Sequence, residues 1–198
     1  MYKNNPVVMS RALVSRIQIV PYLTPEEVKR MFEVAKKGRN GERNSLLVKT
    51  LFETGLRVSE CLSLTPRKID TYEGHAVLYI RGKGNKDRMV ACPDTLAYML
   101  KAYAYSKNLK LDDRIWSISR VRVWQILKEI AEKAGLQKRV YPHLLRHSDA
   151  LERLRRTGNP KALQIHLGHA SFFVTARYLS TLTAEDALRI QQGVNFED

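Results

Sequence analysis

The sequence of 198 residues is poor in cysteine and in long apolar segments. Its two cysteines, Cys61 and Cys92, form neither a CxxC spacing nor a disulfide framework, which fits a protein kept in a reducing compartment. No apolar run approaches the roughly 20 residues that a membrane-spanning helix needs. Residues 1–21 lack an apolar segment followed by a cleavage site, so we expect no signal peptide and a cytoplasmic protein.

Acidic residues are scarce relative to basic ones. The chain has 34 Lys and Arg against 20 Asp and Glu, a formal net charge of +14. This excess favours a polyanionic partner, because each basic side chain that neutralises a phosphate releases condensed counterions. Nucleic acid is the first candidate, an anionic membrane surface is the second, and charge that serves only solubility is the alternative. The carboxylates are scattered along the chain, so no two-metal nuclease site is indicated.

Helical patterns dominate, with one strand-like stretch. Thr24 is a good N-cap residue and Pro25 suits the first helical position, so a helix is expected to begin there and to end at Gly38. From residue 75 to 92 the period changes to two, and HAVLYIR and RMVAC predict a β-hairpin with GKGNK at its tip. The predicted fold class is therefore mainly α with a small antiparallel β-sheet (α+β). Further helices are expected at about 43–54, 58–64, 93–107, 123–134, 142–157, 160–167, 171–179 and 183–192.

The first group of candidate site residues is TGLRVSE. Arg57 follows Gly55, where a helix is expected to stop, and a guanidinium at such a break can point into a cleft and bind a phosphate. Glu60 could hold that guanidinium in place, or the two could form an ordinary surface ion pair. The second group is the hairpin, where a lysine could donate a proton to a leaving oxygen unless the tip is only a solvated basic turn. Its basic residues are Arg81, Lys83, Lys86 and Arg88.

The third group is YPHLLRHSDALERLRR. His143, Arg146 and His147 fall at i, i+3 and i+4, so they share one face near the N-terminus of a helix, where the partial positive charge suits a phosphate. Two histidines at this spacing could also bind zinc. The local pattern supplies no third ligand, so no metal site is predicted.

The fourth group is IHLGHASFFVTARYL. Gly168 permits a sharp turn, His169 follows it, and Tyr178 comes nine residues later on a short helix. Phosphodiester transfer without a metal needs a nucleophile, positive donors around the non-bridging oxygens and a general acid for the leaving oxygen, and this tyrosine could be the nucleophile. The alternatives are a core tyrosine and a structural histidine.

Taken in order, GLRVSE, GKGNKDR, HLLRH and LGHAS with its following tyrosine resemble the tyrosine recombinases, also called phage integrases or Xer-like recombinases, over about residues 22–192. The resemblance implies a catalytic domain that breaks and rejoins double-stranded DNA through a 3′-phosphotyrosine, at the nucleoid and without a cofactor. It makes Tyr178 the nucleophile and Glu60 an acidic support. The residues around the scissile phosphate would be Arg57, Lys83, His143, Arg146 and His169.

The resemblance also implies self-association into dimers or tetramers on DNA. The final helix, at about 183–192, either docks on a neighbouring subunit or folds back on its own chain. Binding is expected to depend on salt. The predicted phosphate contacts are Arg81, Lys86, Arg88, Arg120, Arg122, Lys138, Arg139 and Arg153.

Three features depart from the family pattern. Residues 1–21 are expected to be a basic leader or linker before a catalytic domain at 22–198, where relatives carry a separate N-terminal DNA-binding domain. Asp149 stands where many relatives have an apolar or aromatic residue; it could pair with a nearby base or be exposed. Phe172, Phe173 and a single Thr175 replace a region where paired threonines are common.

Two other functions stay open. A type IB topoisomerase shares the nucleophile and the arginine chemistry, although the LGH group and the short length argue against it. A DNA-binding regulator of the same fold could have lost catalysis, although all the catalytic-type positions carry competent residues. A covalent adduct with DNA separates a recombinase from such a regulator, and Tyr141 is the other candidate nucleophile if Tyr178 is not the one.

Overall fold

The computed structural model describes residues 20–81 and 87–194. The first two helices, α2 (Pro25–Lys36) and α3 (Gly41–Thr54), pack against each other. A capping box begins α2: the Thr24 hydroxyl accepts from the Glu27 backbone N–H, and the Glu27 carboxylate accepts from the Thr24 N–H at 2.8 Å. The buried face of α2 carries Val28, Met31 and Ala35, as the helical spacing predicts.

A small antiparallel sheet follows the short helix α4 (Val58–Leu62) and the turn η1 (Pro66–Lys68). Its strands are β1 (Ile69–Tyr72), β2 (His75–Arg81) and β3 (Asp87–Ala91), in the order β1-β2-β3 within the described residues. The β2–β3 hairpin was predicted. Strand β1 was not, because only Ile69 of its four residues is buried and it shows no alternation of apolar and polar residues.

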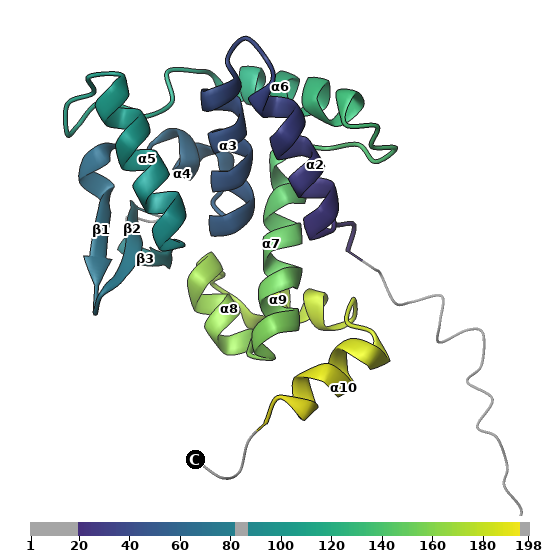
Figure 1. The fold of residues 1–198 in the computed structure, drawn as a ribbon. Coiled ribbons are helices and arrows are strands. Elements are labelled where there is room, and N and C mark those ends of the chain that lie inside the picture. The colour runs from purple at the N-terminus through teal and green to yellow at the C-terminus, as the bar shows by residue number, and fades with distance from the viewer. Residues whose placement is uncertain (1–19, 82–86, 195–198) are drawn as a thin grey trace, which may run out of the picture.

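The helices α5 (Asp94–Ser106), α6 (Arg120–Lys133) and α7 (Pro142–Thr157) complete the larger part of the molecule. Figure 1 shows α7 running down the middle, beside α3. One continuous cluster of buried apolar side chains joins these helices to the sheet. We call this part, residues 23–145, the scaffold.

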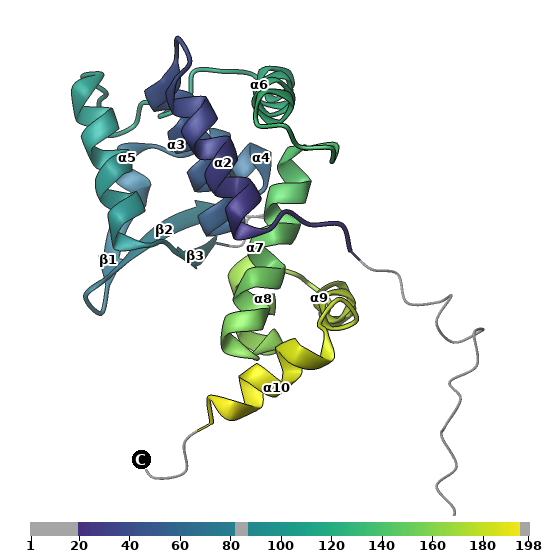
Figure 2. The ribbon, with the colours of Figure 1, turned by 45° about the vertical axis from the view of Figure 1, so that its right-hand side comes forward.

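Three short helices lie at the far end of α7 (Figures 1 and 2): α8 (Pro160–Leu167), α9 (Phe172–Leu179) and α10 (Ala184–Gln192). Helices α8 and α9 share a second, smaller apolar cluster with the end of α7, and we call this cluster and the three short helices the C-terminal cluster. Its buried members are Val20, Ala150, Leu154, Leu163, Leu167 and Tyr178.

Helix α10 folds back on its own chain. The Arg155 guanidinium on α7 donates to the Asp186 carboxylate at 3.1 Å, and Ile190 lies against Gly158 at the end of α7. In the single chain this helix therefore packs on α7, and docking on a neighbouring subunit stays a prediction. None of the helices described is long and apolar enough to cross a membrane.

Candidate active site

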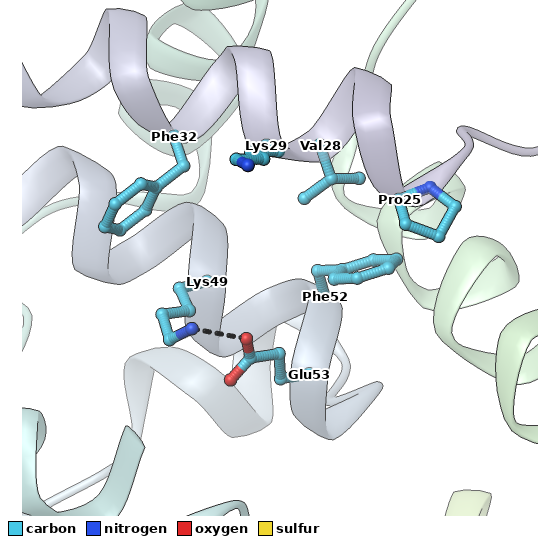
Figure 3. A pocket seen from close by; sticks show the side chains of 7 residues that line it. All are labelled: Pro25, Val28, Lys29, Phe32, Lys49, Phe52 and Glu53. Atoms are coloured by element: carbon cyan, nitrogen blue, oxygen red, sulfur yellow. Dashed lines mark hydrogen bonds and ion pairs between the residues drawn. The ribbon is translucent and has the colours of Figure 1, made fainter. Parts of the chain in front are cut away.

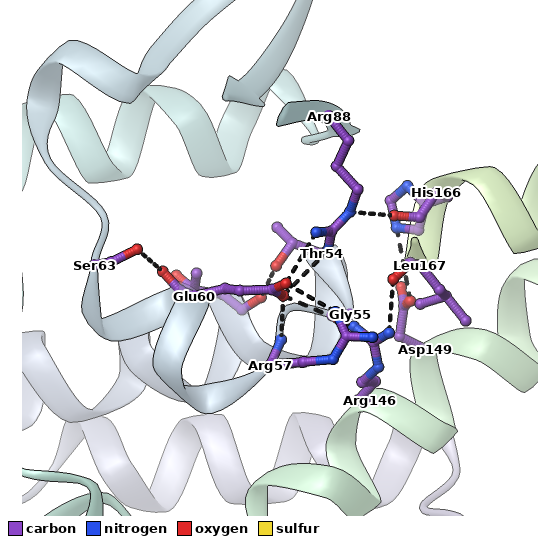
Figure 4. A network of polar contacts seen from close by, with 11 residues as sticks. Thr54, Gly55, Arg57, Glu60, Ser63, Arg88, Arg146, Asp149, His166 and Leu167 are labelled. Atoms are coloured by element: carbon purple, nitrogen blue, oxygen red, sulfur yellow. Dashed lines mark hydrogen bonds and ion pairs between the residues drawn. The ribbon is translucent and has the colours of Figure 1, made fainter. Parts of the chain in front are cut away.

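Glu60 is the centre of a buried ion-pair network (Figure 4). Gly55 ends α3 with a left-handed φ of 58°, and the chain then turns so that Arg57 immediately precedes α4 and Glu60 lies in its first turn. The Glu60 carboxylate accepts from the Arg57 backbone N–H at 2.8 Å and from the Arg57 guanidinium at 2.9 Å. The Arg88 guanidinium donates to both carboxylate oxygens, at 2.9 and 3.1 Å. Burial raises the pKa of Glu60, but these donors outweigh it and hold the pKa below its usual range, so Glu60 is an anion.

Arg146 is the most deeply buried arginine of the network. Its side chain is 2% exposed, and it donates to the carbonyl of Gly55 and, at 2.7 Å, to that of Leu167. These carbonyls end α3 and α8, so one guanidinium joins the scaffold to the C-terminal cluster. Burial, and next the charge of Arg57, lowers the pKa of Arg146 to about 10, which still leaves it protonated at neutral pH.

Tyr178 lies in the C-terminal cluster with its hydroxyl turned toward α7. The hydroxyl is 2.7 Å from Nδ1 of His147, and the ring lies parallel to that of His169, with centroids 6.5 Å apart. Tyr178 and Arg146 line the same cavity of about 160 Å³. Burial raises the pKa of Tyr178, so the phenol holds its proton. The other residues that line the cavity are Val20, His143, His147, His169, Val174 and Arg177.

The histidines of this cavity are neutral. Burial, together with nearby positive charge, lowers the pKa of His147 and of His169 to about 4 and that of His143 below its usual value. His169 is oriented by Thr175, whose hydroxyl lies 2.9 Å from Nδ1. Thr175, in the segment that differs from the family pattern, therefore orients a residue of the predicted site. Phe173, in the same segment, is 85% exposed.

Asp149 is buried below this network and pairs with a base, which was one of the two predicted alternatives. Its Oδ1 accepts from Arg153 at 2.7 Å. Its Oδ2 faces Nε2 of His166 at 3.9 Å, and neither atom has a hydrogen-bond partner. Burial raises the pKa of Asp149 to about 6 and lowers that of His166 to about 3, so burial favours the neutral form of each.

The predicted DNA contacts separate into two sets. Two of the arginines differ from the expectation of an exposed phosphate contact: Arg88 is only 13% exposed and is bound to Glu60, and Arg153 donates to Asp149 and to the Glu53 carbonyl. Both are held inward because a buried carboxylate lies within reach of each. The other described contacts keep exposed side chains; these are Arg81, Arg120, Arg122, Lys138 and Arg139.

Some of the exposed cations also have protein partners. Lys138 donates to Glu27 at 2.7 Å, and Arg139 lies over the ring of Trp124 at 5.5 Å. Lys83 and Lys86 lie outside the described residues. In the part of the chain that is described, no group of three or more His, Cys, Asp and Glu side chains could hold a metal ion.

A separate hollow of about 240 Å³ lies between α2 and α3 (Figure 3). Two of its lining residues, Lys49 and Glu53 on α3, form an ion pair with 2.5 Å between Nζ and Oε1. It contains none of the predicted site residues. It is lined by Pro25, Val28, Lys29, Phe32, Lys49, Phe52 and Glu53.

The sequence places His147 on the helix face that it shares with His143 and Arg146, but no catalytic role was predicted for it. The spacing in HLLRH carried the signal, because i+4 from His143 and i+1 from Arg146 puts His147 at the edge of the same cavity. The inward position of Arg88 had no local signal, since its partner Glu60 is 28 residues away.

The sequence matches the model of the phage integrase family over residues 21–185. It is 37% identical to tyrosine recombinase XerA of Thermococcus kodakarensis over 179 residues, which cover 86% of this chain and 61% of that protein. It is 31% identical to a tyrosine recombinase of Pseudothermotoga lettingae over 197 residues, covering 96% and 68%. The chain belongs to the phage integrase family of tyrosine recombinases. It spans 56% to 68% of the lengths of these relatives and of XerA of Pyrococcus furiosus.

Solved structures agree with this assignment. A crystal structure of XerA recombinase matches with a TM-score of 0.73 and 29% identity over 90% of this chain and 66% of that one. XerH recombinase in a pre-cleavage complex with difH matches with a TM-score of 0.72 and 26% identity over 87% and 53%. The catalytic domain of bacteriophage HP1 integrase, at 22% identity and a TM-score of 0.66, shares the fold over 90% of this chain and 99% of that domain. The predicted fold class, mainly α with a small antiparallel sheet, is confirmed.

Proposed function

We propose that this chain is the catalytic part of a site-specific DNA recombinase in which Tyr178 is the nucleophile. One observation carries the proposal: the Tyr178 hydroxyl, hydrogen-bonded to His147 at 2.7 Å, opens on the same cavity as Arg146. A phenol alone is inert at neutral pH. Beside a buried cation and a neutral imidazole it has both charge stabilisation and a proton acceptor within reach.

In this reaction the Tyr178 oxygen attacks a phosphodiester of DNA. The new O–P bond forms as the bond from phosphorus to the 5′ oxygen breaks, which leaves a 3′-phosphotyrosine and a 5′-hydroxyl. Arg57 and Arg146 stabilise the extra negative charge on the non-bridging oxygens. Glu60 supports this role because it fixes Arg57 by two hydrogen bonds and offsets part of the positive charge of the group.

The remaining predicted catalytic residues have supporting roles. Lys83 protonates the departing 5′ oxygen, and His143 and His169 assist in orienting the phosphate and moving protons. When a second 5′-hydroxyl attacks the phosphotyrosine, the DNA strand is rejoined and Tyr178 is released. The covalent bond conserves the energy of the phosphodiester, so the cycle needs neither ATP nor another cofactor.

The partner in this proposal is double-stranded DNA, on which the protein assembles as a dimer or tetramer at the nucleoid in the cytoplasm. The net charge of +14 supports a polyanionic partner. XerH recombinase, a structural relative, is solved with its difH substrate. In this proposal the exposed cations on β2 and on or near α6 contact phosphates, and so does Lys86, which lies outside the described residues. The exposed cations are Arg81, Arg120, Arg122, Lys138 and Arg139, while Arg88 and Arg153 act from within the protein.

The test is a covalent-trapping assay. Nicked duplexes drawn from the DNA around its gene and from recombination sites of its relatives are incubated with the protein and then denatured. The wild-type chain is expected to give a protein–DNA adduct, and Tyr178→Phe is expected to bind DNA without forming one. Tyr141→Phe is the matched control and should keep the adduct. Binding without any wild-type adduct would identify a silent regulator, and relaxation of supercoils at unrelated sequences would identify a topoisomerase-like enzyme.

A further inference from the structure

His147 is the residue that touches the nucleophile. Among the described side chains, it is the one that hydrogen-bonds to the Tyr178 hydroxyl, Nδ1 to oxygen at 2.7 Å. Its ring also meets the His143 ring edge-on, with centroids 5.1 Å apart. His147, on helix α7, thus lies in contact with both Tyr178 and His143.

The sense of this hydrogen bond follows from the partners available. A phenol has one proton to donate, and Nδ1 of His147 is the acceptor that lies within reach of it. If Nδ1 carried the proton instead, the Tyr178 proton would have no acceptor among the described residues. The neutral ring therefore holds its proton on Nε2 and presents a free lone pair to Tyr178.

The other two histidines of the cavity are less suited to receive this proton. Nδ1 of His169 is occupied by the Thr175 hydroxyl at 2.9 Å, and its ring lies parallel to the tyrosine ring at a centroid distance of 6.5 Å. His143 is more exposed than His147, and its ring contacts that of His147 without a hydrogen bond to the phenol among the described side chains. Geometry thus selects one acceptor of three.

We propose that His147 is a catalytic residue that accepts the Tyr178 proton when the phenolic oxygen attacks the phosphate. This role rests on the proposed function. The Tyr178 O–H bond breaks and an Nδ1–H bond forms, so the imidazole becomes an imidazolium while the O–P bond is made. The 5′ oxygen takes its own proton from a separate donor. In the rejoining step the imidazolium returns its proton to the departing phenolate, and the cycle leaves His147 unchanged.

Bound DNA favours this transfer. In the free protein, burial and the neighbouring positive charges make protonation of His147 costly. A phosphodiester in the cavity brings a negative charge beside the ring, and the pentacovalent transition state carries one more. The imidazolium is therefore stabilised at the stage of the reaction at which it forms.

Two substitutions separate proton transfer from positioning. His147→Asn keeps a hydrogen-bonding group near the place of Nδ1 but cannot accept a proton, and His147→Phe keeps only the ring shape. Both are expected to form the adduct about 10²–10⁴-fold more slowly than wild type in single-turnover assays, with DNA affinity unchanged. The exposed His75→Asn on β2 is the matched control and should react at the wild-type rate.

A substrate with sulfur in place of the 5′ bridging oxygen distinguishes the two ends of the reaction. A thiolate leaves without being protonated. This substrate should therefore restore the rate of adduct formation in a Lys83→Ala variant and should not restore it in the His147 variants. The pH profile gives a second readout: wild type should reach a plateau near neutral pH, whereas His147→Asn should keep rising about tenfold per pH unit as hydroxide takes over.

Several outcomes would overturn the inference. If wild type forms adducts and both His147 variants match it within about twofold, only the role of His147 fails. If His147→Asn is as fast as wild type and His147→Phe is slow, His147 positions Tyr178 and does not take its proton. If wild type forms no adduct on any duplex, the proposed function fails and this role fails with it. In the DNA-free protein, nitrogen NMR should find the proton of His147 on Nε2, and a proton on Nδ1 would contradict the assignment.

Discussion

The scaffold and the C-terminal cluster differ in packing and in what each contributes to the site. The scaffold surrounds a large continuous set of buried apolar residues, and Arg57, Glu60 and Arg88 are anchored to its helices and sheet. The C-terminal cluster buries six apolar residues, and one of them is Tyr178 itself. Elements with few buried contacts open at a lower free energy than a large core does. The ion pairs of Glu60 with Arg57 and Arg88 therefore lie on the more rigid part, while Tyr178, the proposed nucleophile, lies on elements that open more readily.

Arg146 is the residue that connects the two parts. It extends from α7, and its guanidinium donates to the carbonyl groups of Gly55 and Leu167. Arg146 therefore fixes the position of the C-terminal cluster relative to the scaffold as well as supplying charge at the cavity. The following experiments test the difference between the two parts.

The largest effect is expected from Arg146. Arg146→Ala should lower the rate of adduct formation by at least about 10²-fold, because a preorganised cation at the phosphate is lost. Arg146→Lys should restore little, since one ammonium cannot span the two carbonyls that the guanidinium fork reaches. Single-turnover adduct assays measure both. A rate within tenfold of wild type for Arg146→Ala would show that Arg146 is not part of the reacting centre.

The same Leu→Ala substitution should lower the free energy of unfolding more in the scaffold than in the C-terminal cluster. Leu51→Ala removes a fully buried side chain from α3 and should lower the free energy of unfolding by about 4 kcal/mol. Leu163→Ala makes the same change on α8 and should cost about 2 kcal/mol, since its smaller surroundings can collapse into the space. Urea denaturation monitored by circular dichroism measures both. Equal losses would remove the contrast between the two parts.

Local opening should follow the same division. Amide hydrogens of α9 and α10 should exchange through openings roughly 2 kcal/mol lower in free energy than those of α3, because Asp186 is the only buried residue of α10 and α9 buries two. Native-state hydrogen exchange in low urea measures these free energies. A single common value for all these helices would mean that the molecule opens as one unit.

The smallest effect is a loss of stability in acid. Three partly buried histidines have lowered pKa values in the folded protein, about 4 for His147 and His169 and about 3 for His166, below the value of about 6.5 in an unfolded chain. Their contribution is fully present above pH 6.5 and is lost as the pH falls toward 4. Between pH 7 and 5 each should cost on the order of 1 kcal/mol. Denaturation at several pH values measures the total.

Asp149 acts in the opposite direction. Its pKa is raised to about 6, so its protonation on acidification favours the folded state. Asp149→Asn removes this compensation, and the variant should lose stability more steeply than wild type between pH 7 and 5. An unchanged slope would indicate that Asp149 and His166 already share a proton at neutral pH.

The fold followed from local signals wherever the residues of an element carry its pattern. Thr24 and Glu27 specify the start of α2, and the predicted strand HAVLYIR coincides with β2 (His75–Arg81), although three consecutive residues, Ala76, Val77 and Leu78, are buried in it. Strand β1 escaped prediction because its own four residues lack a strand pattern, although the turn that joins it to β2 is local. Glu73 and Gly74 form this two-residue turn with φ values of 49° and 82°, the positive φ that such a hairpin loop requires.

The sequence predicted which residues line the cavity, but not which side chains pair with each other. Spacing along α7 placed His143 and Arg146 on one face, and both line the cavity with Tyr178. Glu60 was expected to hold Arg57 and does so, yet its second partner Arg88 comes from β3 and was assigned to DNA. Which cation a buried carboxylate recruits depends on the three-dimensional path of the chain.

The contact at Val20 has a mechanical consequence. Its backbone N–H donates to the Thr181 hydroxyl at 3.2 Å, three residues beyond Tyr178, and its side chain forms part of the cavity wall. A force transmitted along the polypeptide into position 20 therefore acts directly on the turn after α9. A displacement of the backbone at residue 20 would therefore also move the turn that follows Tyr178, so the position of the phenolic oxygen depends on Val20 as well as on α9 itself.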